Sequence, residues 1–375
     1  MKYCIKNVQK IGGSAAADSR LPKAIRACSI IFSLDARTPH SEIFPFAILC
    51  RLLPSKPGAT RTIPRASISF SLSARVSILL PHCMFTGTYT AIITPFKNGQ
   101  LDHTALERLI EAQVKGGVDG VVPTGTTGES ATLNYEEHIA VIQNSIRFAR
   151  GRITIMAGTG ANSTNEAIYL TRAAEEAGAD ASLQVAPYYN KPTQEGLYQH
   201  FKAIARATKL PIVLYSVPSR CAVEIAVDTV RRLAQDCKNI VAIKESGGSC
   251  DRVSALRAAL GTKFTILSGD DSLTLPFMAV GAQGVVSVAS NVIPREVSQM
   301  VKLFLSGKSD AARRIHEKFY PLFKDLFIET NPGPVKAALA MMGRISEDYR
   351  LPLVPMAKNH RDTLRATMKR CGILK

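Results

Sequence analysis

Lys244 ends an apolar run and is followed by an acid and a loop of small residues, in the stretch VAIKESGG (241–248). An amine that faces a protein interior loses solvation of its charged form, so it extends to solvent, pairs with an acid or stays neutral. A neutral amine attacks carbonyl carbons, and the resulting Schiff base is an electron sink that needs no metal. From position alone, this chemistry and an ion pair, with Glu245 or with an inward acid of another strand, are equally open.

Polar side chains also stand at the ends of other apolar runs. Tyr215 could carry protons to and from a carbonyl adduct, although a buried ring with a satisfied hydroxyl is the commoner role. Thr126 and Thr127, held between glycines, could bind a small carboxylate or form a turn before a helix. Arg220 could clamp a carboxylate through two nitrogens or be a surface residue. None of these side chains identifies a functional site by itself. If the fold brings all of them together at one edge of a sheet, they would indicate a site.

Apolar runs alternate with amphipathic segments from residue 87 onward. Eight runs predict strands, each followed by a predicted helix, at 88–96, 118–125, 153–160, 181–189, 211–218, 240–246, 264–271 and 283–290. Short apolar strands between helices indicate a parallel sheet buried on both faces. Eight such units predict a (β/α)8 barrel over residues 84–307. A doubly wound open sheet is the alternative, but no GxGxxG follows the first strand.

Residues 308–375 carry only helical patterns, which predicts an appended helical segment. In a (β/α)8 barrel the active site lies at the C-terminal ends of the strands. The segments expected there are polar or rich in glycine: GTTGES (125–130), PYYNKPT (187–193), YSVPSR (215–220), Lys244, SGDD (268–271) and GVVSV (284–288). We therefore expect one site at this rim.

Composition and charge favour a soluble globular protein over a nucleic-acid or membrane protein. Of the 375 residues 46% are hydrophobic, and no apolar run reaches the roughly 18 residues that span a bilayer. The net charge of +17 suggests a nucleic-acid partner. However, residues 1–83 hold 12 Lys and Arg against 3 Asp and Glu, and the remainder is only mildly basic. Without zinc-finger spacing or an RNA-binding aromatic motif, we expect no nucleic-acid partner and no membrane span.

Residues 1–83 differ from the rest of the chain. They are rich in Ser, Arg and Pro and keep no helical or strand period, so we exclude them from the fold. The segment is either a transit peptide, which would direct the protein to a plastid, or upstream sequence translated from a start codon before Met84. The second interpretation is favoured. The eight cysteines form no CxxC pair, which is typical of reduced thiols in a cytoplasmic protein.

Eight ordered motifs resemble the 4-hydroxy-tetrahydrodipicolinate synthase (dihydrodipicolinate synthase) family: FTGTYTAIITPF, GTTGESATL, AGTGANST, PYYNKPTQEGLYQHF, LYSVPSR, VAIKESGG, LSGDDS and NPGPVK. The resemblance covers residues 84–374. It implies a pyruvate-dependent class I lyase of lysine and diaminopimelate biosynthesis, assembled as a homotetramer from two dimers. It implies no metal and no cofactor, only pyruvate held covalently on Lys244.

The resemblance also implies roles for individual residues. Lys244 would form the Schiff base with pyruvate, and the enamine would attack the aldehyde of L-aspartate 4-semialdehyde before the product cyclises with loss of water. The residues that match the proton relay are Tyr215, Thr126 and Tyr189, the last lent by a neighbouring subunit. Those that match substrate-binding positions are Thr127 and Val286 for pyruvate, Arg220 for the carboxylate of the semialdehyde, and Gly269.

Sister families share the lysine and the fold: N-acetylneuraminate lyase and the 2-keto-3-deoxy sugar-acid aldolases. Arg220 favours the semialdehyde, because a polyhydroxylated aldehyde needs neutral hydrogen-bonding groups where the semialdehyde carboxylate needs a cation. Two departures from the family pattern remove no catalytic group: Ser216 replaces a usual asparagine, and KESGG replaces KEATG or KEASG. A non-catalytic scaffold is a further alternative, but it would not need Lys244, Tyr215, Thr126, Thr127 and Arg220 together. The least favoured alternative is a basic interaction protein that uses residues 1–83 as an arm to bind nucleic acid.

Feedback inhibition by L-lysine is a further expectation from the resemblance. The family's lysine site at the dimer interface maps to Ser130, Ala131, Tyr135, His138, Asn162, Glu166 and Tyr188. Tyr135 replaces a histidine that is common in inhibited members, whereas His138, Asn162 and Glu166 are kept.

Overall fold

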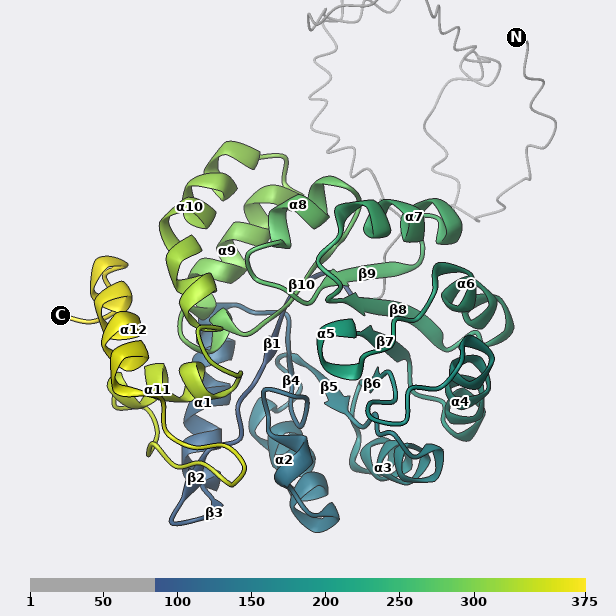
Figure 1. The fold of residues 1–375 in the computed structure, drawn as a ribbon, viewed down its shortest axis with the longest axis horizontal. Coiled ribbons are helices and arrows are strands. Elements are labelled where there is room, and N and C mark those ends of the chain that lie inside the picture. Colours follow the sequence, from purple (N-terminus) through teal and green to yellow (C-terminus); the bar gives the residue numbers. More distant parts are fainter. Residues whose placement is uncertain (1–84) are drawn as a thin grey trace, which may run out of the picture. The chain divides into compact units, whose positions relative to one another are not determined.

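Eight parallel strands close into a barrel in the computed structural model, which describes residues 85–375; the predicted extension 1–83 lies outside the described residues. The strand β1 pairs with both β4 and β10, which closes the sheet (Figure 1). The predicted barrel is therefore confirmed, and the open-sheet alternative is wrong. The strands are β1 Gly87–Ala91, β4 Gly120–Val122, β5 Thr154–Gly158, β6 Ala181–Val185, β7 Ile212–Ser216, β8 Ile240–Glu245, β9 Thr265–Ser268 and β10 Gly284–Ser287.

Helices surround the barrel and are followed by a helical C-terminal segment. The surrounding helices are α1 His103–Gly116, α2 Tyr135–Ala149, α3 Thr164–Ala177, α4 Gln194–Ala207, α6 Val227–Asp236, α7 Cys250–Leu260, α8 Thr274–Ala279 and α9 Pro294–Leu305. The C-terminal helices are α10 Ser309–Asp325, α11 Gly333–Met341 and α12 Lys358–Arg370. The helix α10 packs against α9, and α12 packs against α10 and α11 (Figure 1). No helix within 85–375 has the length and apolarity to cross a membrane.

Short elements occupy several connections. The turn α5 Pro218–Cys221 follows β7, and the 3-10 turns are η2 Ser130–Thr132 and η3 Ala289–Asn291. A small hairpin of β2 Phe96–Lys97 and β3 Gln100–Leu101 follows β1. Its turn residues Asn98 and Gly99 both have positive φ, 53° and 75°. An Asn-Gly pair is a strong signal for such a turn, and the sequence analysis did not use it.

Local capping fixes where α2 begins, directly after the loop that carries Thr126 and Thr127. The side chain of Asn134 accepts a hydrogen bond from the backbone of Glu137, and the Glu137 carboxylate accepts one from the backbone of Asn134. Such a capping box satisfies two backbone donors that the first turn leaves free. The capping box therefore fixes the point at which the loop between β4 and α2 ends.

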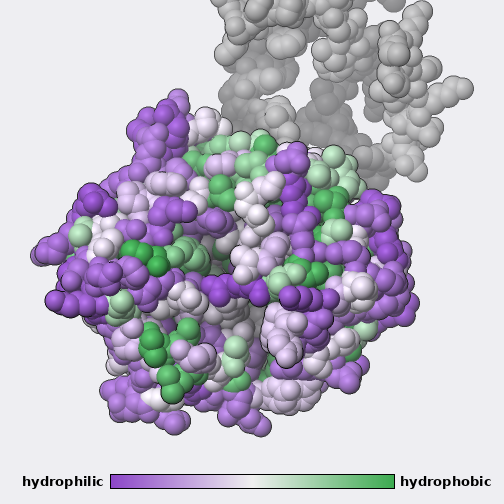
Figure 2. Space-filling view, in the orientation of Figure 1, coloured by the Kyte–Doolittle hydropathy of each residue, from purple (hydrophilic) through white to green (hydrophobic). Residues whose placement is uncertain are grey.

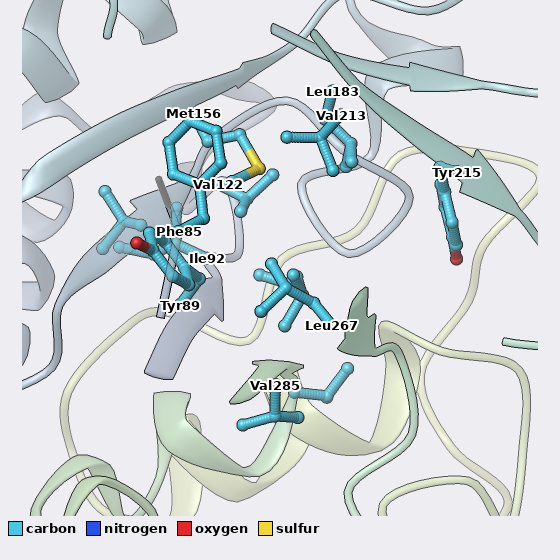
Figure 3. Close-up of a cluster of buried hydrophobic side chains, with 14 of the residues drawn as sticks. Phe85, Tyr89, Ile92, Val122, Met156, Leu183, Val213, Tyr215, Leu267 and Val285 are labelled. Atoms are coloured by element: carbon cyan, nitrogen blue, oxygen red, sulfur yellow. The ribbon is translucent and has the colours of Figure 1, made fainter. Parts of the chain in front are cut away.

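The strands bury both faces, one against the helices and one inside the barrel. Figure 3 shows side chains from several strands meeting in the core, among them Val122, Met156, Leu183, Val213 and Leu267. Side chains on a strand alternate with a period of two, so a residue two positions after a core residue points the same way. The outer surface on the face shown is mainly hydrophilic, with separate apolar spots and a hollow near its centre (Figure 2).

Candidate active site

A cavity of about 310 Å³ opens at the C-terminal ends of strands β4 to β7. Thr126, Tyr215 and Arg220 are among its lining residues, so three of the predicted catalytic and substrate-binding residues meet there. The cavity walls also include residues that the sequence analysis did not single out: Leu183, Val185, Thr330, Asn331, Pro352 and Leu353. The C-terminal segment therefore forms part of the site.

Lys244 lies against the wall that Tyr215 forms. The two residues are register partners on β8 and β7, and the Lys244 Nζ is 4.0 Å from the centre of the Tyr215 ring. Tyr215 follows the core residue Val213 by two positions (Figure 3), so both Tyr215 and Lys244 belong to the inward face of the barrel. The Lys244 side chain is only 6% exposed.

Glu245 does not pair with Lys244. It points to the other side of β8, where its Oε2 accepts from the Arg252 Nε at 2.9 Å and its Oε1 accepts from the Gly247 backbone. Within the described part of the chain, Lys244 has no acidic partner in any ion pair. Of the alternatives that the sequence left open, the ion pair is therefore absent among residues 85–375, and the amine lies buried beside the Tyr215 ring.

Gly269, directly after β9, allows the Lys244 side chain to pass. A Cβ on Gly269 would stand 2.9 Å from the Lys244 Cε and 1.8 Å from the Ser246 Oγ. The Gly269 backbone donates to the Glu245 carbonyl at 2.8 Å, which holds the two strand ends together. Only glycine fits this close approach. Val286 is buried on β10 and, like Lys244 and Gly269, is not among the cavity-lining residues.

The loop after β4 brings two threonine hydroxyls to the site. Thr126 lines the cavity, whereas Thr127 is 3% exposed and its Oγ1 accepts from the Asn331 Nδ2 at 3.0 Å. Thr124 and Glu129 have positive φ, 53° and 56°, so the loop turns sharply at both ends. The predicted carboxylate-binding loop thus has a buried hydroxyl and an accessible one.

Arg220 is exposed at the end of the turn α5, on the cavity wall. Its Nη2 donates to the backbone carbonyl of Asn331 at 3.4 Å. A guanidinium with free donors beside a cavity suits a carboxylate, which it can bind through two parallel hydrogen bonds. The position matches the role expected for an aldehyde substrate that carries a carboxylate.

Tyr189 is not brought to the cavity within one chain. Its side chain is 89% exposed and its φ is 72°. The neighbouring Tyr188 is 38% exposed and does line the cavity. The predicted proton relay of Tyr215, Thr126 and Tyr189 is therefore only partly assembled in the single chain.

Three residues of the predicted lysine site line the cavity: Ser130, Ala131 and Tyr188. Burial, followed by the nearby Glu166 carboxylate, raises the pKa of the Tyr188 hydroxyl. His138 is buried with its Nε2 2.8 Å from a backbone carbonyl at the end of β5, and burial lowers its pKa. The remaining members are Tyr135 on α2, Asn162 just before α3 and Glu166 in the first turn of α3.

A buried ion pair joins the threonine loop to the C-terminal segment. The Lys336 Nζ and the Glu129 Oε1 are 2.5 Å apart, and both side chains are fully buried. Burial raises the pKa of the Glu129 carboxyl and lowers that of the Lys336 amine, while each opposite charge counteracts these shifts. Lys336 belongs to the NPGPVK motif, but its place in the sequence predicts no role for it. Among residues 85–375 no cluster of His, Cys, Asp or Glu could hold a metal ion.

Comparison with known proteins identifies the family. The profile of the dihydrodipicolinate synthetase family matches residues 84–371. The chain belongs to this family. It is 54% identical over 293 residues to the 4-hydroxy-tetrahydrodipicolinate synthase of a Sulfurihydrogenibium species, covering 78% of this chain and 100% of the relative.

Solved structures of dihydrodipicolinate synthases share the fold. The enzyme from Methylacidiphilum fumariolicum SolV has a TM-score of 0.76 and 59% identity, with 77% of this chain and 96% of that chain covered. A dihydrodipicolinate synthase from Cyanidioschyzon merolae, solved with lysine bound, has a TM-score of 0.76 and 40% identity, with 78% and 100% covered. Both structures support the barrel assignment.

Proposed function

We propose that this chain condenses pyruvate with L-aspartate 4-semialdehyde to form (4S)-4-hydroxy-2,3,4,5-tetrahydrodipicolinate, through a Schiff base on Lys244. The observation that carries the proposal is the buried Lys244 amine without an acidic partner among the described residues, set against Tyr215 at a cavity that Arg220 also lines. Relatives that share about half of their residues with this chain over the whole domain are named 4-hydroxy-tetrahydrodipicolinate synthase, and this supports the same reaction.

The Lys244 amine adds to the ketone carbon of pyruvate, and loss of water from the carbinolamine gives the iminium. Loss of a proton from the methyl carbon then gives an enamine, whose carbon attacks the aldehyde of the second substrate. The amine of that substrate attacks the iminium carbon, closes the ring and releases Lys244. The proton transfers to and from oxygen fall to Tyr215 and Thr126, which both line the cavity.

Arg220 supplies the charge that distinguishes the second substrate. Its guanidinium is suited to the carboxylate of the semialdehyde, which lies close to the reacting aldehyde. Pyruvate itself would be held by Thr127, Val286 and Gly269, as the family resemblance implies. A sugar aldehyde has no carboxylate near its aldehyde, so a sister aldolase would gain nothing from a cation at this point.

Borohydride trapping tests the proposal. The protein is incubated with pyruvate and borohydride, and the adduct is mapped by mass spectrometry. We expect one pyruvate-sized adduct on Lys244 that is absent from Lys244→Ala, and consumption of L-aspartate 4-semialdehyde but not of N-acetylmannosamine in turnover assays. A protein that forms no adduct is not a Schiff-base lyase, and turnover of the sugar alone would make it a sister aldolase.

Assembly and feedback inhibition are part of the proposal. The exposed Tyr189 supports a dimer in which each chain lends this tyrosine to its neighbour's site, within a homotetramer. Tyr135, a member of the predicted lysine site, has its ring centre 5.5 Å from that of Tyr169, and both residues are about half exposed. We expect native mass spectrometry to give a tetramer and L-lysine to inhibit turnover. A flat activity curve up to millimolar lysine would reject the inhibition.

A further inference from the structure

Asn331, between α10 and α11, connects two residues of the candidate site. Its Nδ2 donates to the Thr127 Oγ1 at 3.0 Å, across 204 positions of sequence, and its backbone carbonyl accepts from the Arg220 Nη2 at 3.4 Å. Its side chain is 5% exposed, and the residue lines the cavity. Asn331 therefore contacts both the residue expected to hold pyruvate and the residue expected to hold the semialdehyde.

The direction of the hydrogen bond to Thr127 has a chemical consequence. A threonine hydroxyl has one hydrogen to donate and two lone pairs that accept. Asn331 occupies a lone pair, and within residues 85–375 no protein group accepts the Thr127 hydrogen. The hydroxyl hydrogen of Thr127 is therefore available to a hydrogen-bond acceptor in the site. A carboxylate suits this position, because an ionised carboxylate only accepts hydrogen bonds.

The rest of the Asn331 side chain does little for stability. Its Oδ1 is buried without a hydrogen-bond partner among the described residues. A buried acceptor that is left unpaired costs free energy, so an amide at this position is not explained by packing. What the amide supplies is a donor to Thr127, and an aliphatic residue of similar size would supply none.

We propose that Asn331 is a positioning residue for pyruvate. Its amide donates to the Thr127 hydroxyl and so directs the hydrogen of that hydroxyl to the pyruvate carboxylate. The inference rests on the proposed function, because it assigns pyruvate to Thr127. It adds a residue of the C-terminal segment to the site of the barrel.

The contacts around Asn331 hold both partners of this hydrogen bond in place. Glu129, two residues after Thr127, is paired with Lys336, five residues after Asn331, at 2.5 Å in the interior. The Lys336 Nζ also lies 4.5 Å from the centre of the buried Phe96 ring. The amide and the hydroxyl are therefore fixed relative to each other by a second, independent contact.

The variant Asn331→Asp tests the proposal because it keeps the shape and reverses the hydrogen bond. A carboxylate at this position accepts the Thr127 hydrogen and adds a negative charge near the pyruvate carboxylate. We expect the KM for pyruvate to rise at least tenfold and the KM for the semialdehyde to change less than threefold. Asn331→Ala should raise the pyruvate KM less than Asn331→Asp, because Thr127 keeps its hydrogen.

A double-mutant cycle separates positioning from a general loosening of the site. If Asn331 acts through Thr127, Thr127→Val should raise the pyruvate KM, and adding Asn331→Ala to it should have little further effect. The cycle uses Asn331→Ala because this change adds no charge near the pyruvate carboxylate. Additive effects in the cycle, an unchanged pyruvate KM in Asn331→Asp, or equal rises in both KM values would overturn the inference. If Asn331→Asp does not fold, the cycle alone decides.

Failure of this inference can be told apart from failure of the proposed function. If the parent protein forms the borohydride adduct on Lys244 but its pyruvate KM does not depend on Asn331, only the positioning role is wrong. If the parent forms no adduct, the proposed function fails and the positioning role fails with it.

Discussion

Lys244 and Tyr215 are direct partners in the register of two adjacent parallel strands, and the Lys244 Nζ lies 4.0 Å from the centre of the Tyr215 ring. The ring covers one side of the amine, and both side chains are 6% exposed. This arrangement separates two functions of the tyrosine, since the ring shields the amine whereas the hydroxyl can transfer protons.

Tyr215→Phe should separate those functions, because it removes the hydroxyl and keeps the ring. We expect borohydride to trap pyruvate on Lys244 in this variant, while kcat for the condensation falls by roughly 10²- to 10⁴-fold, the usual contribution of a positioned proton donor. Stopped assays of turnover and adduct mapping on the same samples measure both quantities.

Tyr198→Phe is the matched control for Tyr215→Phe. It also removes a hydroxyl from a buried tyrosine, but on α4, where that hydroxyl donates to Asp236. We expect it to keep kcat. If Tyr215→Phe retained full kcat, the hydroxyl would have no part in proton transfer.

Gly269→Ala should disturb Lys244 through a steric contact. The added Cβ would stand 1.8 Å from the Ser246 Oγ and 2.9 Å from the Lys244 Cε, closer than real contacts allow. We expect the rate of borohydride trapping to fall, and Ser246→Ala in the same chain to restore part of it by removing the nearer atom. Gly333→Ala, whose Cβ would meet nothing within 4 Å, is the control. Parent-like trapping in Gly269→Ala would show that the strand ends move apart without cost.

The barrel was predictable because its signal is local. Each strand is a short apolar run, and the period of two places Tyr215 and Lys244 on the same face once β7 and β8 are neighbours. Asn331 was not predictable in the same way, because its partner Thr127 lies 204 positions away and neither residue carries a local mark of the contact.

The buried pair of Lys336 and Glu129 should show strong coupling in unfolding experiments. Removing one partner leaves the other charge buried and unpaired, which typically costs about 3–5 kcal/mol. We expect Lys336→Met and Glu129→Gln each to lower the free energy of unfolding by about that amount. The double variant should lose clearly less than the sum, because it leaves no unpaired charge.

Urea unfolding of the four proteins measures this coupling. Glu317→Gln, which breaks an exposed contact to Arg313 on α10, is the control and should change the unfolding midpoint little. Additive losses from the two buried substitutions would mean that the charges do not stabilise each other in the folded chain.

His200 on α4 should make the folded chain sensitive to acid. Burial lowers the pKa of its imidazole from 6.5 to about 4; the Nδ1 lies 2.9 Å from the Thr164 hydroxyl, and the Nε2 is buried without a partner among the described residues. Between these two pH values the unfolded chain binds a proton that the folded chain does not. The free energy of unfolding therefore falls as the pH drops from about 6.5 to about 4, by up to about 3 kcal/mol from this residue.

The variant His200→Gln isolates this contribution to acid sensitivity. Glutamine does not take up a proton, so the difference in unfolding free energy between parent and variant should shift in favour of the variant as the pH falls through this range. Above pH 6.5 the difference should be constant. His103→Gln, at an exposed histidine on α1, controls for the change of residue type. A difference between parent and His200→Gln that stayed constant from pH 7 to pH 4 would show that the buried ring takes up its proton equally well in the folded and unfolded chains.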